Sequence, residues 1–350
     1  MRVLVTGHHG YIGSVLAPLL AEAGHDVVGL DSFYFRGCDF GDPDEWPNAI
    51  ADDLRDVRAE ALFGFDAVVH LGALSNDPLG DVDPAWTYAI NRDGAVDLAR
   101  AAKEAGVGRF VFACSCSMYG AVDDDALVDE GYPLRPLTPY AESKVRAEEV
   151  ILGLADSSFV PISMRNATAY GVSPRLRLDI VLNNLVAWAH TTGEIKLLSD
   201  GMSWRPLVHI RDIAKVTAAL LDADAAVVSG DAFNIGTTEQ NYLIRDLAET
   251  VRRRLPHCRV TYAKGASPDP RSYRVDFGKL EARLPECRLD WTAELGTDEL
   301  ATAYEREGVT LTDLQEGHRY IRLNHLKRLL HAGELGPDLH WTATETPTTT

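Results

Sequence analysis

Tyr140 and Lys144 form a pair whose residue types and spacing indicate catalysis. They lie four residues apart in "PYAESK", and in a helix this spacing puts both side chains on one face, one turn apart. A tyrosine has an ordinary pKa of about 10, so it acts as a base at neutral pH only where positive charge stabilises its phenolate. A lysine one turn away supplies such a charge. The pair therefore predicts proton abstraction by Tyr140.

Two serine hydroxyls are expected beside this pair. Ser115 and Ser117 stand in "SCSMYG" (115–120), directly after the apolar run "RFVFACS" (109–115). The spacing Tyr-x-x-x-Lys alone is common by chance, and the nearby hydroxyls give it meaning. We take all four side chains as catalytic candidates.

Three glycines near the N-terminus indicate a dinucleotide site. Gly7, Gly10 and Gly13 in "TGHHGYIG" (6–13) lie between an apolar run and a helical pattern, where backbone amides can hold a pyrophosphate. Asp31 ends the next apolar run and is placed to bind the adenosine ribose hydroxyls, which favours NAD over NADP. The alternative, a tight turn without a ligand, stays open at this point.

The paired histidines of the same loop are predicted to be bystanders. His8 and His9 are adjacent, so their side chains diverge, and no third histidine or cysteine nearby would complete a metal site. We expect loop residues near the phosphates, and no metal.

The elements that must position these residues alternate along the first half of the chain. Continuous apolar runs separated by helical patterns predict an α/β fold, a Rossmann-type doubly wound parallel sheet with a smaller mixed C-terminal substrate domain. Strands are expected at 2–7, 26–31, 66–73, 109–115 and 160–167, and helices at 12–23, 84–105, 140–154, around 173–193 and at 249–256.

The domain boundaries follow from where this alternation weakens. We expect an NAD-binding domain at 1–170, with 206–236 returning to it. The substrate-binding domain is predicted at 171–205 and 237–335. Residues 336–350, which end in "TATETPTTT", are expected to form a flexible tail.

Composition excludes several classes of protein. A net charge of −18 over 350 residues argues against a nucleic-acid or anionic-membrane surface. There is no membrane-spanning apolar stretch and no signal-peptide pattern, so we expect a cytoplasmic protein. The cysteines are scattered and predict buried free thiols; they are Cys38, Cys114, Cys116, Cys258 and Cys287.

Together these motifs resemble the extended short-chain dehydrogenases/reductases of the NAD-dependent epimerase/dehydratase family, and the chain is similar to UDP-glucose 4-epimerase. The resemblance implies that Tyr140 is the general base and that Lys144 orients the nicotinamide ribose. It also implies that Ser115 binds the reacting sugar hydroxyl and that Ser117 supplies a second hydroxyl. The implied cofactor contacts are Gly7, Gly10, Tyr11, Ile12, Gly13, Asp31, Asp53, Leu54, Leu71, Gly72, Ala73 and Asn91, with Tyr140 and Lys144.

The resemblance also implies a nucleotide-diphosphate sugar as substrate. Asn184 in "LNNL", Arg205 in "WRPLVHIRD" and Arg271 in "DPRSYR" resemble the groups that hold the diphosphate, and arginine suits phosphate because its planar fork pairs with two oxygens. His209 and Asp212 also fit the family pattern, and a structural role at the domain junction is expected for them.

The sequence departs from the family pattern at three places. Thr168 stands where an asparagine is usual, which puts a copied substrate role for Asn166 in doubt. The segments "SNDPLGD" (75–81) and "SPRLR" (173–177) are unusual and are candidates for setting sugar specificity.

The resulting functional prediction is a homodimeric epimerase that inverts carbon 4 through a 4-keto sugar with bound NAD. Its dimer interface would use helices 84–105 and 140–154. The alternatives are an NAD(P)H-dependent 4-ketoreductase, a 4,6-dehydratase and a non-catalytic NAD-sensing protein. By the resemblance, a dehydratase needs an Asp-Glu pair where this chain has Cys116 and Ser117.

Overall fold

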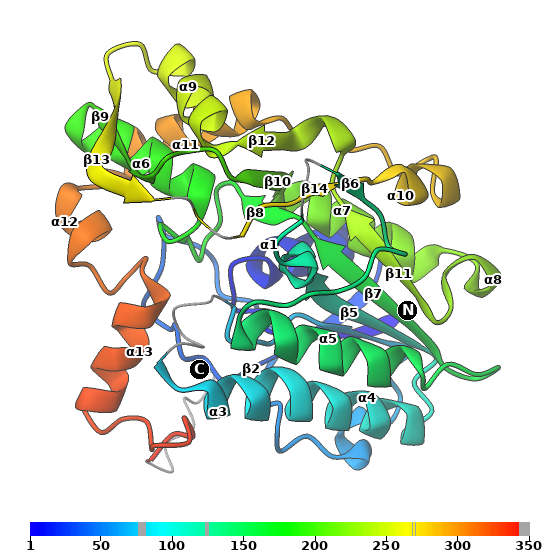
Figure 1. Cartoon of the computed structure of the whole chain (residues 1–350). Helices are drawn as coiled ribbons and strands as arrows, with labels where there is room; N and C mark the ends of the chain where they lie inside the picture. The colour runs from blue at the N-terminus through cyan, green and yellow to red at the C-terminus, as the bar shows by residue number, and fades with distance from the viewer. Residues whose placement is uncertain (76–81, 123–125, 268, 270, 343–350) are drawn as a thin grey trace.

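A seven-stranded parallel sheet forms the centre of the molecule (Figure 1). The structure is a computed structural model and describes residues 1–75, 82–122, 126–267, 269 and 271–342. The strand order is β11-β7-β5-β4-β1-β2-β3. The strands are β1 (Arg2–Thr6), β2 (Asp26–Asp31), β3 (Ala49–Ala51), β4 (Ala67–His70), β5 (Arg109–Ser115), β7 (Val160–Asn166) and β11 (Asp231–Ile235).

Both faces of this sheet are covered by helices, which explains its nearly continuous apolar strands. In β1, Val3 and Val5 pack in one core cluster with α1 (Gly13–Glu22) and α7 (Ile210–Asp222). Leu4 packs in the opposite cluster with α4 (Ala95–Glu104) and α5 (Pro139–Leu152). The predicted Rossmann-type fold is confirmed.

Two helix predictions need correction. The helix expected at 84–105 is α3 (Pro84–Thr87), a π-helical segment η2 (Tyr88–Gly94) and α4. The helix expected around 173–193 begins only at Val181, as α6 (Val181–Thr192), because 173–180 form the loop that links the two halves of the molecule. In the π segment each turn is wider than in an α-helix, which sequence periodicity does not reveal.

The second half of the chain builds a separate core beside the sheet. Helices α6, α9 (Ile244–Arg254), α11 (Ala293–Glu307) and α12 (Leu311–Gln315) pack in this second core. The strands outside the central sheet form the sheet β12-β10-β8 and the pairs β13-β9 and β14-β6. They are β6 (Leu127–Val128), β8 (Thr168–Tyr170), β9 (Glu194–Ser199), β10 (Trp204–His209), β12 (Asn241–Leu243), β13 (Arg259–Ser267) and β14 (Arg274–Val275). The other helices are α8 (Ala225–Val228), α10 (Gly278–Arg283) and α13 (Arg322–His331), with short 3-10 turns η1 (Ala59–Leu62), η3 (Cys116–Tyr119) and η4 (Thr238–Gln240).

Buried polar contacts join the two halves. The Tyr11 hydroxyl donates to the Gly171 carbonyl at 2.7 Å, and Ser173 donates to the Tyr11 carbonyl at 2.8 Å. His209 stacks on Trp291 with 3.8 Å between ring centroids, and Asp212 accepts hydrogen bonds from the backbone nearby. His209 and Asp212 thus make structural contacts in the place expected for them.

The described end of the chain is not a flexible tail. Residues 336–342 return to the sheet domain, where the Tyr34 hydroxyl donates to the Leu339 carbonyl at 2.6 Å. The Trp341 indole donates to the Ser32 carbonyl at 2.7 Å, and Leu339 is fully buried. The tail prediction is therefore wrong for 336–342, because Leu339 and Trp341 find apolar partners; 343–350 lie outside the described residues.

No helix in the described part of the chain is long and apolar enough to cross a membrane. Within the same ranges no cluster of His, Cys, Asp or Glu has the geometry of a metal site. The cysteines are free thiols, four buried and Cys287 partly exposed.

Candidate functional site

A cavity of about 730 Å³ lies where the central sheet meets the second core. Its lining brings together eighteen of the nineteen predicted site residues from across the sequence: Gly7, Gly10, Tyr11, Ile12, Gly13, Asp31, Asp53, Leu54, Leu71, Gly72, Ala73, Ser115, Ser117, Tyr140, Lys144, Asn184, Arg205 and Arg271. This size suits a ligand pocket. The individual roles of these residues stay predictions.

Asn91 does not line the cavity. Its side-chain amide is fully buried, accepts a hydrogen bond from the Leu74 amide at 2.8 Å and donates to the Leu74 carbonyl at 2.9 Å. Because both polar ends of the side chain are used on Leu74, Asn91 orients the segment after β4 and is not placed to touch the cofactor. The contact implied by the resemblance is corrected to a supporting one.

The glycine loop is compact enough to exclude side chains. Gly7 has a φ of 73°, and a Cβ there would stand 2.8 Å from the Gly72 amide nitrogen. A Cβ on Gly13 would stand 2.2 Å from the Gly7 carbonyl oxygen. These positions therefore require glycine, and they leave the loop backbone and the start of α1 open to a bound anion.

His8 and His9 are buried beneath the loop. The His8 ring lies against Gly29 of β2, and His9 packs on Phe33 with 4.7 Å between ring centroids. Burial lowers the pKa of His9 to about 2, and Arg175 donates to its ring. They do not line the cavity, because both rings are buried in the protein. Their position in a loop near the phosphates stays a prediction.

Asp31 and Asp53 mark the end of the cavity nearest β2 and β3. The Asp31 carboxylate accepts hydrogen bonds from the backbone amides of Phe33 at 2.8 Å and His9 at 3.0 Å, which fix its orientation. Burial raises its pKa. Asp53 is held by a bidentate pair of hydrogen bonds from Arg55, at 2.8 and 2.6 Å.

We expect Asp31→Ala to weaken NAD binding about tenfold more than NADP binding. The Asp31 carboxylate can accept a hydrogen bond from the 2′-hydroxyl of the adenosine ribose in NAD. In NADP a phosphate that repels the carboxylate replaces this hydroxyl, so the substitution costs NAD more than NADP. Calorimetric titration of both dinucleotides checks this, with exposed Asp44→Ala as the control. A native protein that already prefers NADP would show this role of Asp31 to be wrong.

Lys144 is a fully buried lysine on the same helix as Tyr140. Its ammonium donates to the Ala113 carbonyl at 2.8 Å and lies 4.7 Å above the Phe112 ring. Burial lowers the pKa of Lys144 to about 8, so it is mostly charged at pH 7. A positive charge held one turn from Tyr140 favours the phenolate.

The serine turn presents hydroxyls to the cavity. Ser115 accepts a hydrogen bond from the Ser117 amide at 3.2 Å, which fixes the turn η3. The Ser117 hydroxyl is buried and has no hydrogen-bond partner among the described residues, and the same holds for the Asn166 carbonyl oxygen. Both line the cavity, so a bound ligand can satisfy them. Asn166, whose role the sequence left in doubt, therefore lies in the site.

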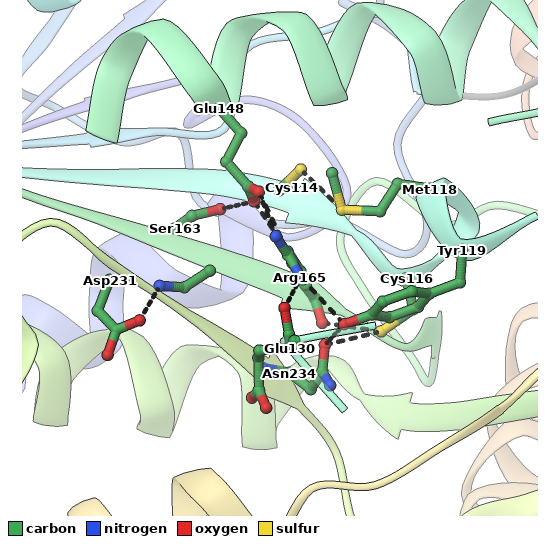
Figure 2. Close-up of polar contacts among 12 residues, drawn as sticks. Cys114, Cys116, Met118, Tyr119, Glu130, Glu148, Ser163, Arg165, Asp231 and Asn234 are labelled. Atoms are coloured by element: carbon green, nitrogen blue, oxygen red, sulfur yellow. Dashed lines mark hydrogen bonds and ion pairs between the residues drawn. The ribbon is translucent and has the colours of Figure 1, made fainter. Parts of the chain in front are cut away.

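A buried ionic network lies behind the serine turn. Figure 2 shows Arg165 of β7 between Glu148 and Tyr119. The Arg165 guanidinium donates to Glu148 at 2.6 Å and to the Tyr119 hydroxyl at 3.1 Å, and Tyr119 donates to Asn234 at 2.7 Å. Glu148 belongs to α5, the helix of Tyr140, while Tyr119 belongs to the serine turn. The network thus connects the helix of Tyr140 and the serine turn to one strand.

The far end of the cavity carries the predicted substrate arginines. Arg205 and Arg271 both donate to Asp269, at 2.8 and 2.9 Å, and Asn184 donates to the Leu178 carbonyl at 2.9 Å. Burial alone would raise the pKa of Asp269, but the two guanidinium groups hold it below its ordinary value. Two arginines on one carboxylate leave an excess positive charge, which suits a diphosphate.

Sequence reasoning missed four charged residues of the described cavity wall: Arg177, Asp179, Asp269 and Arg322. Arg177, in the "SPRLR" segment, makes a bidentate ion pair with Asp179 at 2.8 and 3.1 Å and donates to the Ser75 hydroxyl at 2.9 Å. Arg322 of α13 lines the cavity and is 4% exposed. The unusual "SPRLR" was a usable signal for Arg177; Arg322 had none, and residues 76–81 of "SNDPLGD" lie outside the described ranges.

These features fit a dinucleotide and a second phosphorylated ligand. The glycine loop offers open backbone at a helix start, Asp31 offers oriented acceptors, and unsatisfied polar atoms of Ser117 and Asn166 face the same space. Together with Tyr140 and Lys144, this arrangement can remove a proton from a hydroxyl next to a hydride acceptor.

Comparison with known proteins also points to NAD and nucleotide sugars as ligands of similar proteins. The model of the NAD dependent epimerase/dehydratase family matches residues 3–236. UDP-glucose 4-epimerase of Mycolicibacterium smegmatis is 29% identical over 317 residues, covering 85% of this chain and 96% of the relative. A dTDP-glucose 4,6-dehydratase, DesIV of Streptomyces venezuelae, solved with NAD bound, is 27% identical with a TM-score of 0.76, covering 87% and 97%. MoeE5, solved with UDP-glucuronic acid and NAD, is 25% identical with a TM-score of 0.75, covering 87% and 99%.

Proposed function

Because the chain belongs to the NAD-dependent epimerase/dehydratase family, we propose that it inverts carbon 4 of a nucleotide-diphosphate sugar through a transient 4-keto sugar. The expected cofactor, NAD, is confirmed by the family and by the NAD-bound structures that the chain resembles. Relatives that act on UDP-glucose support a nucleotide sugar as the substrate class.

The cavity residues divide the chemistry between them. Bound NAD would supply a reversible hydride acceptor for carbon 4. Tyr140 takes the proton of the 4-hydroxyl and later gives it back, while Lys144 keeps positive charge beside the phenolate. Ser115 and Ser117 hold the reacting oxygen. Arg205 and Arg271 anchor the diphosphate, so the sugar can rotate between the two hydride transfers while its nucleotide stays bound.

The observation that carries this proposal is the make-up of the serine turn. A 4,6-elimination needs an acid to protonate the departing hydroxide, and the turn 115–120 contains none. Cys116 is 1% exposed and its thiol contacts the Arg165 carbonyl at 3.0 Å. Burial raises the pKa of that thiol well above its ordinary value, and Cys116 does not line the cavity. Inversion without elimination is the course that these side chains support.

A 4,6-dehydratase is the second candidate, favoured by the 27% identity to the S. venezuelae enzyme over 87% of the chain. Asp179 lines the cavity and is a carboxyl group that such an elimination could use as its acid. Asp179 and Tyr140 both raise the pKa of Arg177. Its bidentate ion pair with Arg177 weakens it as a proton donor.

A panel of UDP-, dTDP-, GDP-, CDP- and ADP-sugars, followed by NMR and mass spectrometry, tests the proposal. We expect a product of unchanged mass with one inverted carbon and no net change in NAD. A product lighter by one water identifies the dehydratase, stoichiometric consumption of NADH identifies a ketoreductase, and NAD binding without any turnover identifies a sensor. Each of these three outcomes overturns the epimerase.

We further propose a homodimer that pairs the helical layer formed by α3 to α5 with its copy. Val150 on α5 is 37% exposed and apolar, and Val150→Glu should shift the protein toward monomer. Light scattering at micromolar concentration measures this, with Leu295→Glu, an exposed position on α11, as the control. A monomeric native protein would contradict the proposal.

A further inference from the structure

The last described part of the chain, here called the C-terminal arm (residues 322–342), packs against the adenosine end of the cavity. Figure 1 shows α13 at the side of the molecule on which α3 lies, and Trp86 of α3 donates to the Pro337 carbonyl of the arm at 2.7 Å. Leu326, Leu329, Leu335 and Leu339 of the arm form one apolar cluster with Tyr34 and neighbouring residues of the sheet domain. The arm therefore covers the cavity end that also contains Asp31 and Asp53.

The arm fixes the two loops that carry these acidic residues. Trp341 donates to the Ser32 carbonyl at 2.7 Å, directly after Asp31. Arg55, which donates two hydrogen bonds to the Asp53 carboxylate, also donates to the Asp338 carbonyl at 2.7 Å. The positions of both carboxylates thus depend on contacts more than 280 residues away along the chain.

Arg322, the first residue of α13, brings a buried cation into the cavity. It is 4% exposed, lies 3.7 Å above the Phe35 ring and donates through Nη2 to the Arg175 carbonyl at 3.3 Å. Its Nη1 is buried and has no hydrogen-bond partner among the described residues. No carboxylate within the described ranges forms an ion pair with it. A buried guanidinium left in this state is unfavourable without an anionic ligand.

The neighbours of Arg322 indicate which anion it binds. Arg322 donates to the Arg175 carbonyl, and the Arg175 amide donates to the Ser173 hydroxyl at 3.0 Å. The Ser173 hydroxyl lies 3.0 Å from that of Ser14 in the first turn of α1, so hydrogen bonds connect Arg322 to the start of that helix, directly after the glycine loop. In a dinucleotide, the group between the adenosine ribose and the nicotinamide ribose is the diphosphate, which carries the cofactor's negative charge. The substrate arginines, Arg205 and Arg271, are paired separately with Asp269.

We propose that Arg322 binds the diphosphate of NAD in the cavity that the glycine loop also lines, and that the C-terminal arm retains the cofactor during the catalytic cycle. This inference rests on the proposed function for its purpose, since an epimerase regenerates its NAD and gains nothing by releasing it. A guanidinium pairs with two phosphate oxygens, and stacking on Phe35 holds it ready to do so.

Binding measurements on the cofactor-free full-length protein test the role of Arg322. We expect Arg322→Gln to weaken NAD and ADP-ribose, which contain the diphosphate, by about 10- to 100-fold, and to leave adenosine within about threefold. The matched control is Arg328→Gln on the same helix, whose side chain is 42% exposed and pairs with Glu334. Equal loss for adenosine and ADP-ribose would overturn the proposal, and so would a loss confined to NADP.

Thermal unfolding separates a ligand role from a structural one. Removing a buried, unpaired charge should leave the melting temperature of the cofactor-free protein unchanged or higher, while the increase caused by NAD becomes smaller. A melting temperature that falls without cofactor, together with an unchanged increase on adding NAD, would show that Arg322 only supports the fold. If Arg322→Gln fails to fold, the same titrations on Arg322→Lys decide, with a smaller loss expected for ADP-ribose.

The rate of NAD release tests the arm. We expect Trp341→Ala to speed dissociation of NAD at least about tenfold, because the loop of Ser32 loses its hydrogen bond. An unchanged rate would contradict retention by the arm. None of these measurements needs turnover: a native protein that binds NAD but converts no sugar overturns the epimerase alone, whereas equal NAD affinity with and without Arg322 overturns this inference alone.

Discussion

Tyr140→Phe is expected to bind NAD as tightly as the native protein and to transfer hydride at least about 100-fold more slowly. The substitution removes only the phenolic oxygen, so α5 and Lys144 keep their packing. That oxygen is the group to which the proposal assigns the proton of the sugar hydroxyl, so its loss slows hydride transfer. Single-turnover measurement of NADH formation with an accepted nucleotide sugar reports this step directly.

The control for this variant is Tyr262→Phe, because Tyr262 is 53% exposed and lies outside the cavity. It should keep native rates. Turnover of Tyr140→Phe near the native rate would remove Tyr140 from its role as the base. A rate loss accompanied by weaker NAD binding would instead point to a disturbed pocket.

The sheet could be predicted because its strands are buried on both faces. Val3, Leu4 and Val5 are all apolar although they point alternately to opposite sides, and each side packs under helices. The same run of apolar residues in a one-sided sheet would alternate with polar ones. The local sequence pattern was therefore sufficient to predict both the class of fold and the position of the glycine loop.

Asn91 shows where a family position misled. Asn91 lies in the segment η2, which is a π-helix. In this segment the Asn91 side chain faces the Leu74 backbone and not the cavity. The π segment is only seven residues long, so the apolar pattern of the sequence is too short to reveal its wider turn.

Arg322 shows what no local pattern could indicate. In "YIRLNHLKR" an arginine between apolar residues is typical of the solvated side of an amphipathic helix. It is buried because Leu326 and Leu329 anchor α13 on Tyr34 and its neighbours, far away in the sequence. Such a contact depends on tertiary packing, and so do the contacts of 336–342 with the sheet domain, which the sequence pattern does not indicate.

Glu148→Gln is expected to lower the free energy of unfolding by about 3–5 kcal/mol. Glu148 and Arg165 are 5% and 8% exposed, so the substitution leaves a guanidinium buried without its counter-charge. Burial alone would lower the pKa of Arg165, but the hydrogen bonds and charge of Glu148 raise it. Arg165 is therefore charged in the native protein. Urea denaturation followed by circular dichroism measures the loss.

A double variant distinguishes a lost charge pair from lost packing. Replacing both partners, as Glu148→Leu with Arg165→Leu, removes the buried charges together and should restore much of the lost stability. The exposed pair Arg254 and Asp298 supplies the control, because Asp298→Asn should cause no measurable change. If the double variant were as unstable as Glu148→Gln, the Tyr119 and Ser163 contacts would be the stabilising part of the network. Because Glu148 shares α5 with Tyr140, recovery of stability without recovery of turnover would show that the ion pair also aligns the catalytic helix with the serine turn.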